Sequence, residues 1–381
     1  MNTAVIENKT GTTWKELAHQ LGKDFATRAA DHDQNDSFVK ENYEVLKNHR
    51  FFAAIIPKEL GGEGVTHAEM CDILRIIAQN CSSTALALSM HQHLLSANIW
   101  KYKKGKGGEE MLRKVADQQL ILISTGARDW LESNGEMVKV KDGYRVTAEK
   151  HFASQSAVGN VLVTSAPYKD PEKGWSVLHF PVPIKAEGVM VMDNWYALGM
   201  RGTGSHTVKL ENVFVPEASI ILTRPKGEFH MFWNVILTVA MPLIMSVYVG
   251  IAEKAARIAI EKAKNKKAAK PQATFQLGEL QNELTTAQVL LKDMISLANG
   301  FDFDPVDEVG NAILVRKTLV ANACMRTVGK ALEIAGGQSF FRSSELERLF
   351  RDVQGAPHHP LPEKEQQHFT GMFLLGEKYI V

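Results

Sequence analysis

The sequence predicts a mainly helical α+β protein with an N-terminal helical domain, a middle antiparallel β-domain and a C-terminal four-helix bundle. Apolar residues recur at helical spacing in the first third, alternate with polar residues from about Leu120, and return to helical spacing after about Glu228. The chain has 381 residues, 45% of them hydrophobic, which is enough for two or three domains. We place the domain boundaries at residues 1–118, 119–226 and 227–381.

The first domain is predicted to consist of amphipathic helices. Apolar residues between Trp14 and Phe25 fall at the i, i+3, i+4, i+7 spacing of one helix face. Residues 82–84 (SST) offer hydroxyls that can cap the N-terminus of a helix over the apolar run 85–90. The Gly- and Lys-rich segment 101–108 is expected to be a loop.

The middle domain has the period of two that indicates strands. Val138 and Val140 alternate with Lys139 and Lys141, and the Asp142-Gly143 dipeptide that follows is a hairpin signal because glycine tolerates positive φ. Further strands are expected at residues 160–165, 176–182 and 207–215, the last stopped by Pro216.

The last domain is predicted to hold helices at residues 232–264, 274–299, 307–335 and 343–353. Residues 235–252 are nearly all apolar and approach the length of a membrane span. They include Pro242 and Gly250 and lead directly into a charged stretch, so we predict a helix buried at the centre of the bundle.

Composition favours small-molecule chemistry in the cytoplasm. Lys plus Arg number 44 and Asp plus Glu 43, so no strong field attracts nucleic acid or a membrane surface. The three cysteines lack C-x-x-C spacing, which fits a reducing compartment. The N-terminal residues lack the basic-then-apolar order of a signal peptide, and a cytoplasmic location is expected.

Several segments resemble the acyl-CoA dehydrogenase superfamily. Residues 198–207 (LGMRGTGSHT), followed by 210–216 (LENVFVP), resemble its longest signature. The other matching segments, in the expected order, are residues 57–62 (PKELGG), 150–154 (KHFAS), 331–337 (ALEIAGG) and 346–352 (LERLFRD). The resemblance covers the chain from about residue 15 to residue 376 and implies a flavin-dependent oxidoreductase. Such an enzyme oxidises an acyl-CoA or related small organic substrate by hydride transfer to flavin N5.

The resemblance also implies where a flavin would bind. Ser124, Thr125 and Ser154 stand in segments that line the flavin edge in the family, and strand hydroxyls suit the hydrogen-bonding edge of an isoalloxazine ring. In the family a Gly-Gly pair and a Gln from a neighbouring subunit hold the FAD diphosphate, which here implies Gly336, Gly337 and Gln276. A homodimer or homotetramer with FAD, served by an electron-transfer flavoprotein, is therefore expected.

Each of these assignments has a structural alternative. The hydroxyls can lie on solvated strands, and the Gly-Gly pair can be a helix C-cap. Arg201, in the signature loop, is a candidate cofactor-binding residue or the partner of a nearby carboxylate. The sequence has no G-x-G-x-x-G after a strand and no Walker A run, which disfavours Rossmann and P-loop enzymes.

The chain departs from the family at the catalytic base. Where the family carries a glutamate after the Arg-Asp pair, residues 357–361 read PHHPL, and the other family position for the base holds Asn234. Glu228 and Glu333 are carboxylates that a shift of alignment would bring nearer. The usual catalytic glutamate is therefore predicted to be absent.

His359 instead matches the spacing of the flavin-dependent monooxygenase branch, in which a histidine follows the Arg-Asp pair and lies near flavin C4a. That reading implies FMN, reduced by a separate flavin reductase, and O2. His358 is the less favoured neighbour, and a purely structural His pair holding the Pro-flanked turn is the alternative. A further hypothesis is a flavoprotein-like scaffold without catalysis.

Two other positions, His91 and Asn234, are expected to line a substrate pocket. His91 and His93 lie about 200° apart on a helix and lack a third ligand, so a metal site is not expected.

Overall fold

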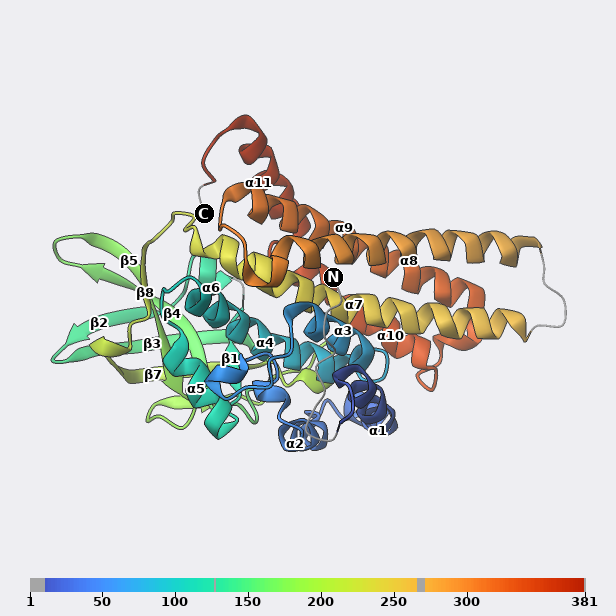
Figure 1. Cartoon of the computed structure of the whole chain (residues 1–381), viewed down its shortest axis with the longest axis horizontal. Coiled ribbons are helices and arrows are strands. Elements are labelled where there is room, and N and C mark those ends of the chain that lie inside the picture. Colours follow the sequence, from blue (N-terminus) through green and yellow to red (C-terminus); the bar gives the residue numbers. More distant parts are fainter. Residues whose placement is uncertain (1–10, 127, 266–270, 380–381) are drawn as a thin grey trace.

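The computed structural model describes residues 11–126, 128–265 and 271–379. Figure 1 shows the β-sheet at one end of the molecule, helices packed beside it, and a long helical hairpin projecting from the opposite end. The order of helices, sheet and helices is the predicted one, and the mainly helical α+β fold class is confirmed.

Helices form the first part of the chain. Thr13 caps the first of them through a capping box with Glu16, and Trp14, Leu17 and Phe25 on its inner face are buried. The helices are α1 (Trp14–Gln34), α2 (Lys40–Asn48), α3 (His67–Ala78), α4 (Ser82–Lys103) and α5 (Glu109–Gln118).

Two local predictions about α4 are wrong. The N-cap is Cys81, with no side-chain cap, because the Ser82 hydroxyl donates instead to the carboxylate of Asp352 in the last part of the chain. The helix also continues to Lys103, into the segment expected to be a loop.

The middle part is one eight-stranded sheet with the order β6-β7-β3-β2-β4-β5-β8, and β1 pairs with β4. Most neighbours are antiparallel, as predicted, but β1 and β2 each run parallel to β4. The strands are β1 (Leu122–Ser124), β2 (Glu136–Val140), β3 (Gly143–Ala153), β4 (Val161–Asp170), β5 (Gly174–Pro183), β6 (Val189–Val191), β7 (His206–Pro216) and β8 (Leu222–Pro225). A short helix, α6 (Arg128–Leu131), follows β1.

The hairpin predicted at Asp142-Gly143 joins β2 to β3, for a reason different from the one expected. Asp142, not Gly143, has the left-handed backbone, with φ 63°. A Cβ on Gly143 would lie 2.4 Å from the Val215 carbonyl oxygen and 2.8 Å from the Phe214 ring. Glycine is needed at residue 143 because β7 approaches closely.

The C-terminal helices are α7 (Phe232–Lys264), α8 (Pro271–Ala298), α9 (Asp307–Ala335), α10 (Glu345–Val353) and α11 (Glu363–Leu375). The bounds of α7 and α9 are those predicted, whereas α11 was not anticipated. The most apolar stretch of α7 is completely buried, so it is a core helix, as the sequence indicated.

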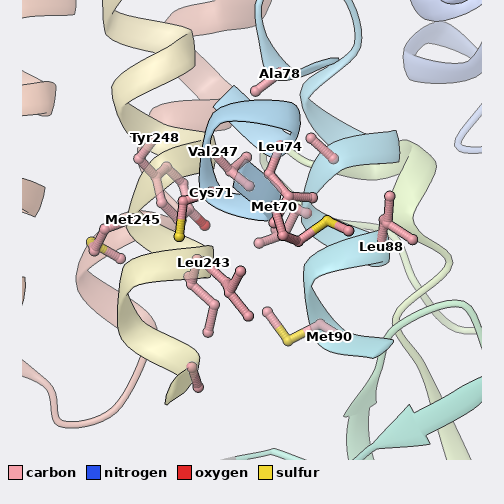
Figure 2. Packing of buried hydrophobic residues seen from close by; sticks show 14 of the residues in the cluster. Met70, Cys71, Leu74, Ala78, Leu88, Met90, Leu243, Met245, Val247 and Tyr248 are labelled. Atoms are coloured by element: carbon pink, nitrogen blue, oxygen red, sulfur yellow. The ribbon is translucent and has the colours of Figure 1, made fainter. Parts of the chain in front are cut away.

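The core lies where α7 packs against both α3 and α4. Figure 2 shows Met70 and Leu74 of α3, Met90 of α4, and Leu243 and Val247 of α7 converging in it. Side chains that interlock in this way hold the helices at fixed positions. The site described next depends on that rigidity, because α4 and α7 carry part of it.

Candidate functional site

The turn after β3 carries Ser154, one of the predicted flavin-edge residues. Its Oγ lies 2.7 Å from Ser205 Oγ, which in turn lies 2.7 Å from Thr203 Oγ1. The next residue, Gln155, accepts a hydrogen bond from the Tyr43 hydroxyl and donates one of 2.7 Å to the Leu122 carbonyl. Helix α2, strand β1 and the signature loop therefore all hold this turn in one conformation.

The segment that carries Ser124 and Thr125 lies against the same turn. The Gly126 amide donates to the His151 carbonyl at 3.0 Å, and the Thr125 hydroxyl donates to the carboxylate of Asp129. The structure therefore brings the three predicted edge hydroxyls to one end of the sheet.

An exposed aromatic surface adjoins these hydroxyls. Phe152 has a left-handed backbone, with φ 58°, and is 64% exposed. Its ring packs edge-on against Trp195 at a centroid distance of 6.0 Å, and Tyr196 and Leu198 nearby are also exposed. Large apolar side chains gathered at a surface usually mark a binding site. The combination of exposed aromatic side chains and fixed hydroxyls fits a flat aromatic ligand.

A buried carboxylate connects the signature loop to the helical bundle. Asp352 of α10 accepts a 2.6 Å hydrogen bond from the Met200 amide and a second from the Ser82 hydroxyl. Burial raises the pKa of Asp352 above its usual value. Both carboxylate oxygens therefore hold α10 against α4 and the signature loop. This role is structural, and it also fixes the position of the segment that follows α10.

His359 follows α10 and is held from two sides. Its Nε2 lies 2.7 Å from the hydroxyl of Tyr248 on α7, and the two rings pack at a centroid distance of 5.4 Å. The buried Lys317 ammonium donates to the Pro357 carbonyl at 3.2 Å and to the Leu361 carbonyl at 2.9 Å, which clamps the turn on both sides of the histidine.

The electrostatics of this turn keep the imidazole neutral. Burial lowers the pKa of His359 to about 3, with the Lys317 charge adding to the effect. Burial also lowers the pKa of Lys317 to about 8. His358, by contrast, is exposed at the end of a short 3-10 helix, which leaves His359 as the inward-facing member of the pair.

The residues predicted to hold a diphosphate form a second cluster, on the bundle. The ion pairs Lys330–Glu279 at 2.9 Å and Arg326–Glu283 at 2.8 Å set the antiparallel register of α8 and α9. This register places Gln276 level with the last turn of α9, whose C-cap is Gly336.

The glycines of this cluster differ from each other. Gly336 is the C-cap of α9, with φ 81°, so the structural alternative holds for it. Gly337 has no such backbone requirement, and a Cβ there would meet nothing within 4 Å. Packing within the described residues of this chain therefore does not explain why residue 337 is a glycine. A glycine there would allow another molecule to approach the backbone closely.

Two predicted residues, Arg201 and Asn234, have structural partners away from the flavin-edge hydroxyls. Arg201 donates to the Ala197 carbonyl at 2.9 Å and lies 3.5 Å from the Asp36 carboxylate, the alternative considered for it. Asn234 is completely buried and donates to Asp307 at 2.8 Å, at the start of α9.

The prediction that His91 lines a substrate pocket is wrong. It is completely buried; Nδ1 accepts from the Leu122 amide at 3.0 Å and Nε2 lies 2.8 Å from the Phe52 carbonyl. Both ring nitrogens are occupied by backbone groups, so the imidazole has no atom left for a substrate.

Sequence reasoning missed the residues that support the site. Tyr248 and Asp352 are joined to their partners across 111 and 270 residues of chain. The buried pair of Lys150 and Asp129 was missed as well. Signals were available: Tyr248 is a polar residue inside an otherwise apolar helix, and Lys150 and Asp352 stand in the family-like segments 150–154 and 346–352.

Comparison with known proteins agrees with this geometry. Residues 13–119 match the acyl-CoA dehydrogenase N-terminal domain family and residues 243–362 match the C-terminal domain family, together more than half of the chain. The chain belongs to the acyl-CoA dehydrogenase superfamily of flavoproteins. The predicted class, a flavin-dependent oxidoreductase, is confirmed.

The relatives include both dehydrogenase-like and oxygenase-like proteins. A putative acyl-CoA dehydrogenase of Bacillus subtilis is 25% identical, over 93% of this chain and 94% of its own length. The pigment production hydroxylase of a Rhodococcus species is 26% identical, over 90% and 91%. The solved structure of KijD3 with FMN and a dTDP-amino sugar has a TM-score of 0.87 at 22% identity, covering 100% and 98% of the two chains, and shows the shared fold.

Proposed function

We propose that this protein is a flavin-dependent monooxygenase of the superfamily, which uses O2 and flavin reduced by a separate reductase, with His359 as its proton-transfer group. The observation that carries this proposal is the inward-facing imidazole, bonded to Tyr248, at the place where the family's dehydrogenases carry a carboxylate. The relationship to a hydroxylase, at 26% identity, supports it.

The carboxylates that could replace the missing glutamate, Glu228 and Glu333, and the nearby Asp352 do not fit a base. Glu228 is exposed in the segment before α7. Asp352 uses both oxygens to bind Ser82 and the Met200 amide. Glu333 is half exposed and paired with Lys330 on the bundle. An oxygenase does not need a carboxylate to take an α-proton, so their engagement elsewhere favours the monooxygenase over the acyl-CoA dehydrogenase.

The chain's own residues have defined roles in this proposal. Ser124, Thr125 and Ser154 would bind the flavin edge, and Phe152 would cover the adjoining ring surface. A flavin bound there supplies the electrons that oxygen activation needs. His359, neutral at physiological pH, would hydrogen-bond the reacting group at the ring nitrogen that Tyr248 does not occupy. It would carry a proton only transiently, because its pKa is about 3, and Tyr248 fixes its orientation.

Two incubations distinguish the reactions. In the first, protein loaded with oxidised flavin is mixed anaerobically with acyl-CoA thioesters of several chain lengths; the proposal predicts that the yellow colour persists. In the second, protein loaded with reduced FMN is mixed with oxygenated buffer in a stopped-flow instrument; two separable absorbance phases are expected, because the site delays release of H2O2.

His359→Ala should collapse these two phases into one, whereas the exposed neighbour variant His358→Ala should keep both. Bleaching by an acyl-CoA, or identical traces for wild type and His359→Ala, contradicts the proposal. A protein that binds neither FAD nor FMN would support the scaffold hypothesis instead.

We further infer that Gln276, Gly336 and Gly337 serve the flavin of a second copy in a homo-oligomer. Support comes from the open space at Gly337 and from Phe340, which is 87% exposed three residues later. Gly337→Glu should weaken binding of FAD more than of FMN, because only FAD has a diphosphate. Gly371→Glu on α11, also in open space, is the control; equal losses for both flavins would contradict the inference.

A further inference from the structure

Lys150, at the end of β3 that leads to Ser154, has a side chain that is completely buried. Its Nζ lies 2.8 Å from Asp129 Oδ1, 2.7 Å from Asn134 Oδ1 and 2.7 Å from the Ser165 carbonyl oxygen. All of these atoms are acceptors. The Asn134 carbonyl oxygen, at 3.1 Å, is a further acceptor. Burial lowers the pKa of Lys150 and Asp129 raises it, and an ammonium, with three donors and no lone pair, is the form that suits a site made only of acceptors.

Asp129 is the centre of the same network. While Oδ1 accepts from Lys150, Oδ2 accepts from the hydroxyls of Thr125 and Thr164, the latter at 2.9 Å. A carboxylate whose neighbours are all donors is ionised. Because the Thr125 hydroxyl donates its hydrogen bond to Asp129, its oxygen can only accept a hydrogen bond from any further partner.

A second buried cation completes the network. Arg224 of β8 donates to the Asp129 carbonyl at 3.3 Å, to the Leu131 carbonyl at 3.2 Å and to His179 Nε2 at 3.1 Å. His179 accepts this bond and is neutral; burial, followed by the Arg224 charge, lowers its pKa to about 3. The network therefore contains two cations and one anion, an excess of one positive charge beside the Thr125 loop.

We propose that Lys150 and Asp129 are positioning residues of the flavin site: they turn the Thr125 oxygen toward a ring N–H, and their charges, together with that of Arg224, set a net positive charge beside the ring that favours reduced flavin. This inference rests on the proposed flavin site at Ser124, Thr125 and Ser154. Reduced flavin is anionic above neutral pH, and a fixed charge in a dry interior acts on it with little screening.

Substitutions of Lys150 and of Asp129 should change the affinity for reduced flavin in opposite directions. Removing the positive charge, in Lys150→Met, should lower the affinity for reduced flavin relative to oxidised flavin. Removing the negative charge, in Asp129→Asn, should raise it. Structural damage to the loop would move both variants in the same direction, so the sign separates an electrostatic role from a merely structural one.

The test measures dissociation constants of oxidised and of anaerobically reduced FMN and FAD, at pH 8, for wild type and variants. We expect the ratio of the two affinities to change about tenfold in each single variant, or about 30 mV for a two-electron couple. The double variant Lys150→Met/Asp129→Asn should return close to the wild-type ratio. Lys139→Met, which removes a surface lysine paired with Glu217 on the same sheet, is the matched control and should change nothing.

Shifts of the same sign in both single variants, or unchanged ratios in variants that bind flavin, would overturn the inference and leave the proposed function intact. If Lys150→Met fails to fold, Asp129→Asn and the double variant still carry the test. Failure of the wild-type protein to bind either flavin would overturn the proposed site and this inference together.

Discussion

At the scale of single residues, the contact between Tyr248 and His359 is the feature on which the chemistry depends. A neutral imidazole has one donor and one acceptor nitrogen, and the bond made by one nitrogen fixes what the other can do. The Tyr248 hydroxyl, whose pKa burial raises well above the usual value, remains protonated and holds His359 Nε2. The remaining nitrogen is thereby oriented for proton transfer.

Replacing Tyr248 with Phe removes this bond and keeps the ring. We expect a loss of about 1 kcal/mol in the free energy of unfolding, the usual net value of a hydrogen bond, measured by urea denaturation. Because the imidazole is no longer fixed, more H2O2 should form per reduced FMN oxidised. Tyr168→Phe, on β4 in the sheet, is the control; a Tyr248→Phe protein with wild-type H2O2 yield would show that the bond does not position His359.

At the scale of secondary structure, the helices were easier to predict than the turns. The bounds of α7 and α9 follow from long apolar periods that tertiary contacts reinforce. The helix α11 was missed because its apolar residues, at 369 and 372–375, are gathered near its C-terminal end instead of recurring at helical spacing along it. The cap of α4 was assigned to local hydroxyls, yet Ser82 binds a carboxylate 270 residues away.

The β2–β3 hairpin gives a prediction at this scale. Gly143→Ala should lower the free energy of unfolding by about 1–3 kcal/mol, the typical cost of forcing a methyl group into packed structure. Its Cβ would lie 2.4 Å from the Val215 carbonyl oxygen. Asp142→Gly places glycine at the neighbouring left-handed position and should leave stability unchanged or raise it. The reverse order of stabilities in thermal melts would contradict this account of the turn.

At the scale of the whole molecule, much of the fold and only part of the site could be predicted from sequence. The order of the segments and the signature motifs indicated the fold. They also led to the prediction that Ser124, Thr125 and Ser154 lie at one site. Pairs formed by distant segments, such as Tyr248 with His359 and Lys150 with Asp129, depend on packing that no local pattern encodes. His91 was misassigned because its partners are backbone groups of other segments.

Buried neutral histidines make the whole molecule sensitive to acid. Burial lowers the pKa of His67, His91 and His93 to about 4, and of His179 and His359 to about 3. Unfolding restores a pKa of about 6.5, so the unfolded chain binds more protons as the pH falls below that value. The stability from each histidine is complete above pH 6.5 and is lost as the pH falls toward 4. Asp352, whose pKa is raised, opposes this trend as a single group.

Urea denaturation at pH 7.5 and pH 5.5 checks this. Each of the five histidines should lower the free energy of unfolding by about 1.4 kcal/mol at pH 5.5. His67→Gln can keep the hydrogen bond to the Val239 carbonyl. In this variant the decrease in the free energy of unfolding between pH 7.5 and pH 5.5 should be smaller by the contribution of one histidine. Equal stability at the two pH values would contradict burial of these side chains in the neutral form.

The proposed chemistry requires a flavin ring that lies between the hydroxyls at the end of the sheet and the imidazole on the bundle. A crystal structure of the complex with FMN tests this most directly. We expect Thr125 and Ser154 at the ring edge and the His359 imidazole, with no carboxylate, within about 3.5 Å of the space where the substrate reacts. A flavin bound elsewhere, or a glutamate or aspartate facing the ring in place of His359, would contradict the account.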